Sequence, residues 1–261
     1  MEIKQCVPIP GCGPGGRPAI RRETFTKTSC RHAVAALAVL CCISASAAPY
    51  PTEGQLRIAI GSVAGLLKTE GIRLEIFDAQ KEGMTQPLLA TALDVTGDSC
   101  LVFYNTKPEN GLIQFFDAFH EKDLPVLLNA LAVHEATHCF EQRKTMVRKR
   151  ADKVLPADFK RDTTVSQGYV PAEKSDASVT WGEALADIAS VLYLQQVVPG
   201  QWAYFANSLA AMRHDLARKW PAHDTSAWLY KIIAAEAGQA ADQSLFEAAV
   251  QLRSQFRPNQ S

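Results

Sequence analysis

The hydrophobic pattern of this chain changes at Asp123. Between Gln55 and Asn105 the apolar residues come in short runs bounded by glycine and aspartate, which is typical of strands joined by turns. We expect strands at three of these runs: 56–60, the alternating 72–77, and 100–104. Turn-forming residues bound the runs at Gly61, Gly71, Gly83 and 96–98. The segment 49–122 is therefore predicted to be an N-terminal β-containing part.

From Asp123 onward the apolar residues recur at the spacing of amphipathic helices. The first helix is predicted from Asp123, with an early Pro125, to about Lys144. Four more helices are expected at 178–198, 201–219, 226–237 and 241–256. The fold class we expect is α+β, in which a small β-sheet precedes a mainly helical bundle at 123–261.

A polar and basic stretch at 145–176 separates the first two predicted helices. It contains prolines and a glycine and is predicted to be a long loop. Loops of this length inside a domain usually have a function, so this one is a candidate lid or substrate-binding element.

The first predicted helix carries the sequence HEATH at 134–138. Because four residues make about one helical turn, His134 and His138 leave the same face with Cβ atoms about 6 Å apart, and both can bind one metal ion. Glu135 is displaced by about 100° around the helix axis, so it can reach a water on that ion rather than the ion itself. The alternative is two histidines on a polar helix face beside an incidental glutamate.

A hydrolytic zinc site needs three protein ligands and one open position for water. The metzincin pattern would continue with glycine at 141 and histidine at 144, but this chain has Glu141 and Lys144, which excludes that class. The next predicted helix offers a carboxylate instead, within the sequence WGEALAD at 181–187.

Glu183 and Asp187 lie four residues apart in that sequence and share one face of the helix. Glu183 can bind the metal while Asp187 accepts a hydrogen bond from the free N–H of a ligand histidine. Their neighbours are small and apolar, so two inward-facing acids would be costly without a cation. The alternative is a solvated pair of acids on the outer face. If a Glu183→Ala variant kept its full metal affinity, the third ligand would instead be Asp187, His214 or His223.

HEATH followed by GEALAD resembles the gluzincin class of zinc metallopeptidases, the thermolysin-like group with HExxH and a downstream glutamate. The resemblance covers these two helices and assigns no narrower family. It implies Zn²⁺ held by His134, His138 and Glu183. It also implies Glu135 as the catalytic base, Asp187 behind a ligand histidine, and a strand beside the active-site helix, for which 100–104 is the candidate.

Zinc in such a site lowers the pKa of its bound water towards about 7 and polarises a substrate carbonyl, while Glu135 moves the proton to the leaving amine. The developing oxyanion needs a further donor, which related enzymes commonly supply as a downstream tyrosine or histidine. His223 is the first candidate because it lies at a predicted loop-to-helix junction, where a side chain can point into a cleft. A surface histidine beside a helix cap is the alternative for His223. Other candidate donors are His214, Arg213 and Tyr169.

Residues 1–48 have the order of a secretory signal peptide with a long n-region. A basic stretch precedes the apolar run 33–43, and small residues follow at 44–48. The apolar run has about 11 residues, whereas a membrane-spanning helix needs roughly 20, so cleavage is favoured over a permanent anchor. We predict cleavage near Ala47 or Ala48 and an exported chain, periplasmic or secreted.

Cleavage there leaves two of the seven cysteines, Cys100 and Cys139. Two remaining cysteines in an oxidising compartment meet the condition for one disulfide, so we predict a Cys100–Cys139 bridge. Two free buried thiols are the alternative.

Lysine plus arginine and aspartate plus glutamate both total 27, so no overall charge draws the chain to nucleic acid or to an anionic membrane. The sequence favours an exported zinc metallopeptidase that acts on a peptide or protein and has no stable membrane anchor. Two alternatives stay open: a zinc-dependent cell-wall amidase, and a gluzincin-like zinc-binding adaptor without turnover. Glu135 argues against the adaptor, because a pure binder has no need of a carboxylate at that position.

Overall fold

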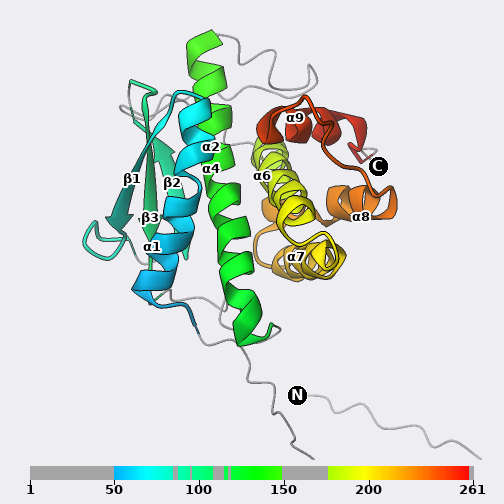
Figure 1. The fold of residues 1–261 in the computed structure, drawn as a ribbon, viewed down its shortest axis with the longest axis horizontal. Coiled ribbons are helices and arrows are strands. Elements are labelled where there is room, and N and C mark those ends of the chain that lie inside the picture. Colours follow the sequence, from blue (N-terminus) through cyan, green and yellow to red (C-terminus); the bar gives the residue numbers. More distant parts are fainter. Residues whose placement is uncertain are drawn as a thin grey trace, which may run out of the picture. The chain divides into compact units, whose positions relative to one another are not determined.

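The computed structural model describes residues 50–258, apart from 85–87, 95, 108–114, 117–118 and 149–175 (Figure 1). The signal peptide predicted at 1–48 and most of the loop predicted at 145–176 lie outside the described residues. The first residues of that predicted loop, up to Arg148, continue the preceding helix instead.

Three strands form one mixed sheet in the order β1-β3-β2. β1 (Arg73–Asp78) runs parallel to the central strand β3 (Ser99–Tyr104). β2 (Leu89–Leu93) runs antiparallel to β3 and lies at an edge of the sheet. The edge position leaves one side of β2 outside the ladder that the described strands form.

The strands predicted at 72–77 and 100–104 are confirmed as β1 and β3. Gly71 and Gly97, which precede these strands, have positive φ, a conformation that glycine adopts without a Cβ clash. The sequence pattern does not predict β2, because its five residues include two alanines, which have low strand propensity.

The strand predicted at 56–60 is wrong, because these residues belong to helix α1 (Glu53–Ser62). A capping box begins the helix: Thr52 Oγ1 accepts from Gln55 N–H, and Gln55 Oε1 accepts from Thr52 N–H. The apolar side chains are buried at helical spacing, at Leu56, Ala59 and Ile60. The cap and this spacing outweigh the strand-like run, and the short helix α2 (Ala64–Thr69) follows.

The helical part begins with the short 3-10 helix η1 (Glu121–Asp123). It continues with α4 (Leu124–Arg148), α6 (Asp176–Val197), α7 (Trp202–Leu216), η2 (Pro221–His223), α8 (Ser226–Ala234) and α9 (Leu245–Gln255). A small sheet ahead of a mainly helical part confirms the α+β class. Of the helices in the described ranges, none combines the length and the apolar character that crossing a membrane requires.

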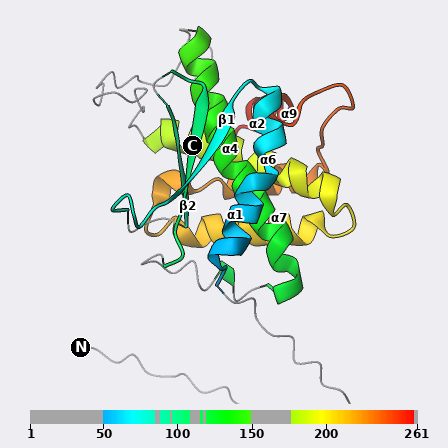
Figure 2. The same cartoon turned by 60° about the vertical axis from the view of Figure 1, so that its left-hand side comes forward.

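Helix α4 lies between the sheet and the later helices (Figures 1 and 2). On its sheet side, Cys139 Sγ lies 2.07 Å from Cys100 Sγ on β3, and Gln142 Oε1 accepts from Leu93 N–H at 3.1 Å. The strand alongside α4 is the edge strand β2, not the expected 100–104, which is the central strand and contacts α4 less. The sheet thus packs against one side of the helix that carries HEATH and is linked to it by these two contacts.

The C-terminal helix α9 contacts α4 and α6 through Arg253, whose side chain is 2% exposed. Its guanidinium donates to Glu141 Oε1 at 2.6 Å and to the Trp181 carbonyl at 2.8 Å. It also lies 4.2 Å from the centroid of the Trp181 ring. Ion pairing and the cation–π contact offset the cost of burying this charge.

Candidate metal centre

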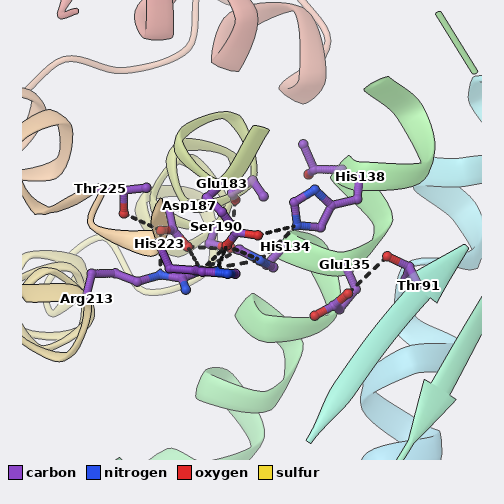
Figure 3. Close-up of polar contacts among 12 residues, drawn as sticks. Thr91, His134, Glu135, His138, Glu183, Asp187, Ser190, Arg213, His223 and Thr225 are labelled. Atoms are coloured by element: carbon purple, nitrogen blue, oxygen red, sulfur yellow. Dashed lines mark hydrogen bonds and ion pairs between the residues drawn. The ribbon is translucent and has the colours of Figure 1, made fainter. Parts of the chain in front are cut away.

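His134 and His138 lie one turn apart on α4 and point to the same side, as their spacing predicts (Figure 3). Their Nε2 atoms are 3.1 Å apart, and their ring centroids are 4.8 Å apart. His134 is buried, and the His138 side chain is 20% exposed. The pair therefore presents two nitrogen atoms to one point that solvent can reach.

Glu183 on α6 brings a carboxylate to these two nitrogens. Its Oε2 lies 3.4 Å from His134 Nε2, and its Oε1 lies 3.5 Å from His138 Nε2. The preceding residue, Gly182, packs so closely on α4 that a Cβ there would lie 3.3 Å from Glu141 Oε2. The absence of a side chain at 182 thus allows α6 to approach the histidine face of α4.

The ligand atoms of His134, His138 and Glu183 all lie within 4.8 Å of one another, and this group could hold a metal ion. Tetrahedral bonds of about 2.1 Å place neighbouring ligand atoms about 3.4 Å apart. The two Nε2 atoms are 3.1 Å apart, and each lies 3.4 to 3.5 Å from a different oxygen of Glu183, which is close to such a spacing. The three residues could therefore hold a metal ion.

Asp187, one turn after Glu183, lies behind His134. His134 Nδ1 donates to Asp187 Oδ1 at 2.8 Å, so the ring turns Nε2 toward the ligand cluster. Asp187 Oδ2 accepts from the hydroxyl of Thr225, which precedes α8. The predicted position of Asp187 behind a ligand histidine matches this geometry.

Arg213 on α7 lies between the two acids rather than open to a substrate. Its Nη2 is 2.9 Å from Glu183 Oε2, and its Nε donates to Asp187 Oδ2 at 2.7 Å. Arg213 is a candidate oxyanion donor by sequence, but its pairing with the two acids was not predicted. One signal was present in the sequence, because Arg213 continues the buried stripe formed by Ala206, Leu209 and Ala210.

The charges at this site shift one another's pKa values. Burial lowers the pKa of His134, but Asp187 and Glu183 outweigh burial and raise this pKa to about 10. Burial raises the pKa of Asp187, but Arg213 and His134 outweigh it and lower this pKa to about 2. Burial also opposes ionisation of Glu183, yet three surrounding histidines hold its pKa well below the usual range. Both acids are therefore ionised, and without a metal His134 carries a proton.

His223 lies at the end of η2, with Nδ1 3.4 Å from Glu183 Oε2 and a side chain that is 39% exposed. The structure thus brings this candidate oxyanion donor to the metal cluster. His214 is instead 71% exposed, and its nearest acid is Asp224 at 3.9 Å. Tyr169, the remaining candidate donor, lies outside the described residues.

Glu135 is offset around the helix from the two histidines and turns away from α6 toward the sheet (Figure 3). Its Oε2 accepts from the hydroxyl of Thr91 on β2 at 3.1 Å. Glu135 is not part of the possible metal-binding group found among the described residues. The sequence gives no signal for Thr91, because β2 itself is not predicted.

In comparisons with known proteins, no family model matches this chain, and neither a curated protein nor a solved structure matches it significantly. Evidence for a function therefore comes from the residues of the site.

Proposed function

We propose that this chain is an exported zinc-dependent metallopeptidase. The observation that carries the proposal is a partly buried His-His-Glu cluster with a further acid, Glu135, next to a ligand histidine but outside the ligand group. Three protein ligands leave a position for water, which is the arrangement of catalytic rather than structural zinc sites. Glu135 then supplies the base that hydrolysis requires.

The donor set favours zinc among the common divalent cations. Two imidazole nitrogens and one carboxylate suit zinc, whereas calcium and magnesium prefer oxygen ligands only. When bound, zinc would lower the pKa of a water and polarise a carbonyl. His134, His138 and Glu183 are the residues that would hold it, and the hydrogen bond from Asp187 would keep His134 in the required orientation.

The remaining side chains have separate roles in the proposed reaction. Glu135 accepts a proton from the attacking water and transfers it to the leaving amine nitrogen. His223, close to Glu183 and partly exposed, donates a hydrogen bond to the oxygen that becomes negative. Arg213 holds the two acids rather than the substrate, because its Nε and Nη2 are engaged by Glu183 and Asp187.

The edge strand β2, which pairs on one side only among the described strands, favours a peptide as the substrate. Asp94 N–H donates to Ser99 C=O, and Asn105 N–H donates to Leu88 C=O, which fixes the phase of the β2–β3 ladder. Because facing groups alternate in an antiparallel pair, Leu89, Thr91 and Leu93 present their backbone groups to the other edge. Leu93 N–H bonds to Gln142 and Leu89 is buried, so the position at which an extended peptide could pair is the backbone of Thr91.

The N-terminal sequence and the cysteine pair support export. Residues 1–48 follow the pattern of a signal peptide, and the Cys100 and Cys139 sulfurs are at bonding distance, 2.07 Å. Disulfides persist in secreted and periplasmic proteins and are rare in the cytosol. Export to the periplasm or beyond is therefore the location we propose.

A peptide-library digestion monitored by mass spectrometry tests the function, with Glu135→Gln as the matched variant. We expect cleavage that a chelator stops and zinc restores. Glu135→Gln should retain zinc and lose about 100- to 10,000-fold in turnover, because an amide cannot accept the proton. Loss of zinc in this variant would make Glu135 a ligand and contradict the proposal.

The same assay separates the alternatives. Release of cell-wall peptides by hydrolysis of an amide in peptidoglycan, without cleavage of the peptide library, would identify a zinc amidase. Zinc binding with no turnover of either substrate would identify an adaptor.

A further inference from the structure

Thr91 lies in the middle of β2 and touches the proposed catalytic base. Its Oγ1 lies 3.1 Å from Glu135 Oε2, across the junction of the sheet and α4 (Figure 3). An ionised carboxylate only accepts hydrogen bonds, so the hydroxyl is the donor. A hydrogen bond to a charged group is among the stronger polar contacts in proteins.

The contact fixes a side chain that the metal ligands do not fix. Glu135 belongs to the sheet-facing side of α4 and lies outside the ligand group, whereas glutamate has three rotatable side-chain bonds. A partner on β2 limits this rotation and sets the direction of the second carboxylate oxygen. The base can then meet a water at one place instead of sampling several.

The donor is itself held in place relative to α4. Two residues along the strand, Leu93 N–H donates to Gln142, which lies two turns after Glu135. The next strand is joined to the same helix by the Cys100–Cys139 pair. These links hold the Thr91 hydroxyl at a constant distance from the helix that carries the base.

We propose that Thr91 is a positioning residue that orients Glu135 for proton transfer. The inference rests on the proposed function and deepens it by adding a residue to the same site. Because the backbone of Thr91 belongs to the edge that would pair with a peptide, the strand that binds the substrate also orients the base. Thr91 touches no metal ligand in the hydrogen bonds described, so its effect falls on turnover and not on zinc binding.

Three threonine variants test the role. Thr91→Val has nearly the same shape but no donor, and Thr91→Ser restores a donor. The control Thr69→Val removes an exposed hydroxyl on α2 that bonds to the Leu66 carbonyl. For Thr91→Val we expect unchanged zinc stoichiometry and affinity by calorimetry. We also expect kcat on the library peptide to fall about 10- to 100-fold with KM unchanged, and Thr91→Ser to recover most of it. Thr69→Val should behave as wild type.

A second readout does not need turnover. In zinc-loaded protein labelled with carbon-13 at the glutamate carboxyl, the Glu135 resonance is assigned by its loss in Glu135→Gln. Thr91→Val should move this resonance, and Thr91→Ser should return it toward the wild-type position. Thr69→Val should leave it where it is.

The outcomes separate this inference from the proposed function. Unchanged kcat and an unmoved Glu135 resonance in Thr91→Val would overturn the positioning role, and so would loss of zinc in that variant. If the wild type binds zinc but cleaves no peptide, the proposed function fails. The resonance then decides alone whether Thr91 orients Glu135.

Discussion

Two buried arginines pack against helix α6, and their surroundings differ. Arg253 meets Glu141, a backbone carbonyl and the face of Trp181. Arg213 meets two acids, Glu183 and Asp187, in a group that also contains histidines. At Arg213 two negative charges face one arginine, so one further positive charge is needed to balance them.

A buried ion pair does not by itself mark a functional site. Both arginines are buried and both pair with acids, yet of these two groups only that of Arg213 needs a further positive charge. In the metal-free protein the missing charge is a proton on His134, whose pKa is raised to about 10. We expect a metal ion to replace that proton.

Removing each arginine should have the largest effect on stability and should distinguish the two regions. Arg253→Met removes the buried arginine that pairs with the partly buried Glu141 and should lower the free energy of unfolding by about 3–5 kcal/mol, with zinc stoichiometry unchanged. Arg213→Met should destabilise the metal-free protein by a similar amount, because two acids lose their partner. Zinc should then stabilise Arg213→Met more than it stabilises wild type, since the cation replaces the lost charge.

Denaturant unfolding with and without zinc measures both effects. Arg253→Met should gain no more stability from zinc than wild type gains. Equal stabilisation of the two arginine variants by zinc would contradict the distinction between the two regions.

Substituting an acid in each region should affect zinc affinity in one case and stability in the other. Glu183→Ala removes one of three ligands and should weaken zinc binding about 100- to 1,000-fold. The matched variant Glu141→Ala removes the partner of Arg253 and should lower stability while leaving zinc affinity unchanged. Competition with a chromophoric chelator measures both affinities. Full zinc affinity in Glu183→Ala would move the third ligand to Asp187 or His223.

The metal cluster was predictable because it follows from local periodicity. HEATH and GEALAD lie within strongly patterned helices, so helical geometry alone sets which side chains share a face. The fold class and most helix positions follow from the same periodicity. Arg213 also has a signal in the sequence, because it is a charged residue within an apolar stripe. Its partners become visible only from the packing of α7 on α6.

Other features depend on contacts between distant segments. The alanines of β2 have little strand propensity, and its pairing with β3 outweighs them, so Thr91 has no local signal. At 56–60 the opposite error occurred, because a short apolar run fits either a strand or a buried helix, and the capping residues decide.

The pH dependence of zinc binding gives the smallest of these effects. Because His134 binds a proton with a pKa of about 10 in the metal-free protein, zinc must displace that proton near neutral pH. Affinity should therefore rise with pH by up to about tenfold per unit between pH 6 and 8. Calorimetry in buffers of different ionisation enthalpy should show a proton released on binding, and a pH-independent affinity would contradict the charge exchange.

The same raised pKa predicts the stability of the metal-free protein. A histidine whose pKa is higher in the folded state stabilises that state fully below its unfolded value, about 6.5. This stabilisation is lost as the pH rises toward about 10. Bound zinc should remove this dependence, because the proton is then absent.

The most direct test of the metal centre is elemental analysis of the purified chain beginning near Pro49, compared with the double variant His134→Ala/His138→Ala. The account predicts about one zinc per chain in the wild type and none in the variant. No metal in either protein after incubation with zinc would contradict the account and make HEATH a coincidence of sequence.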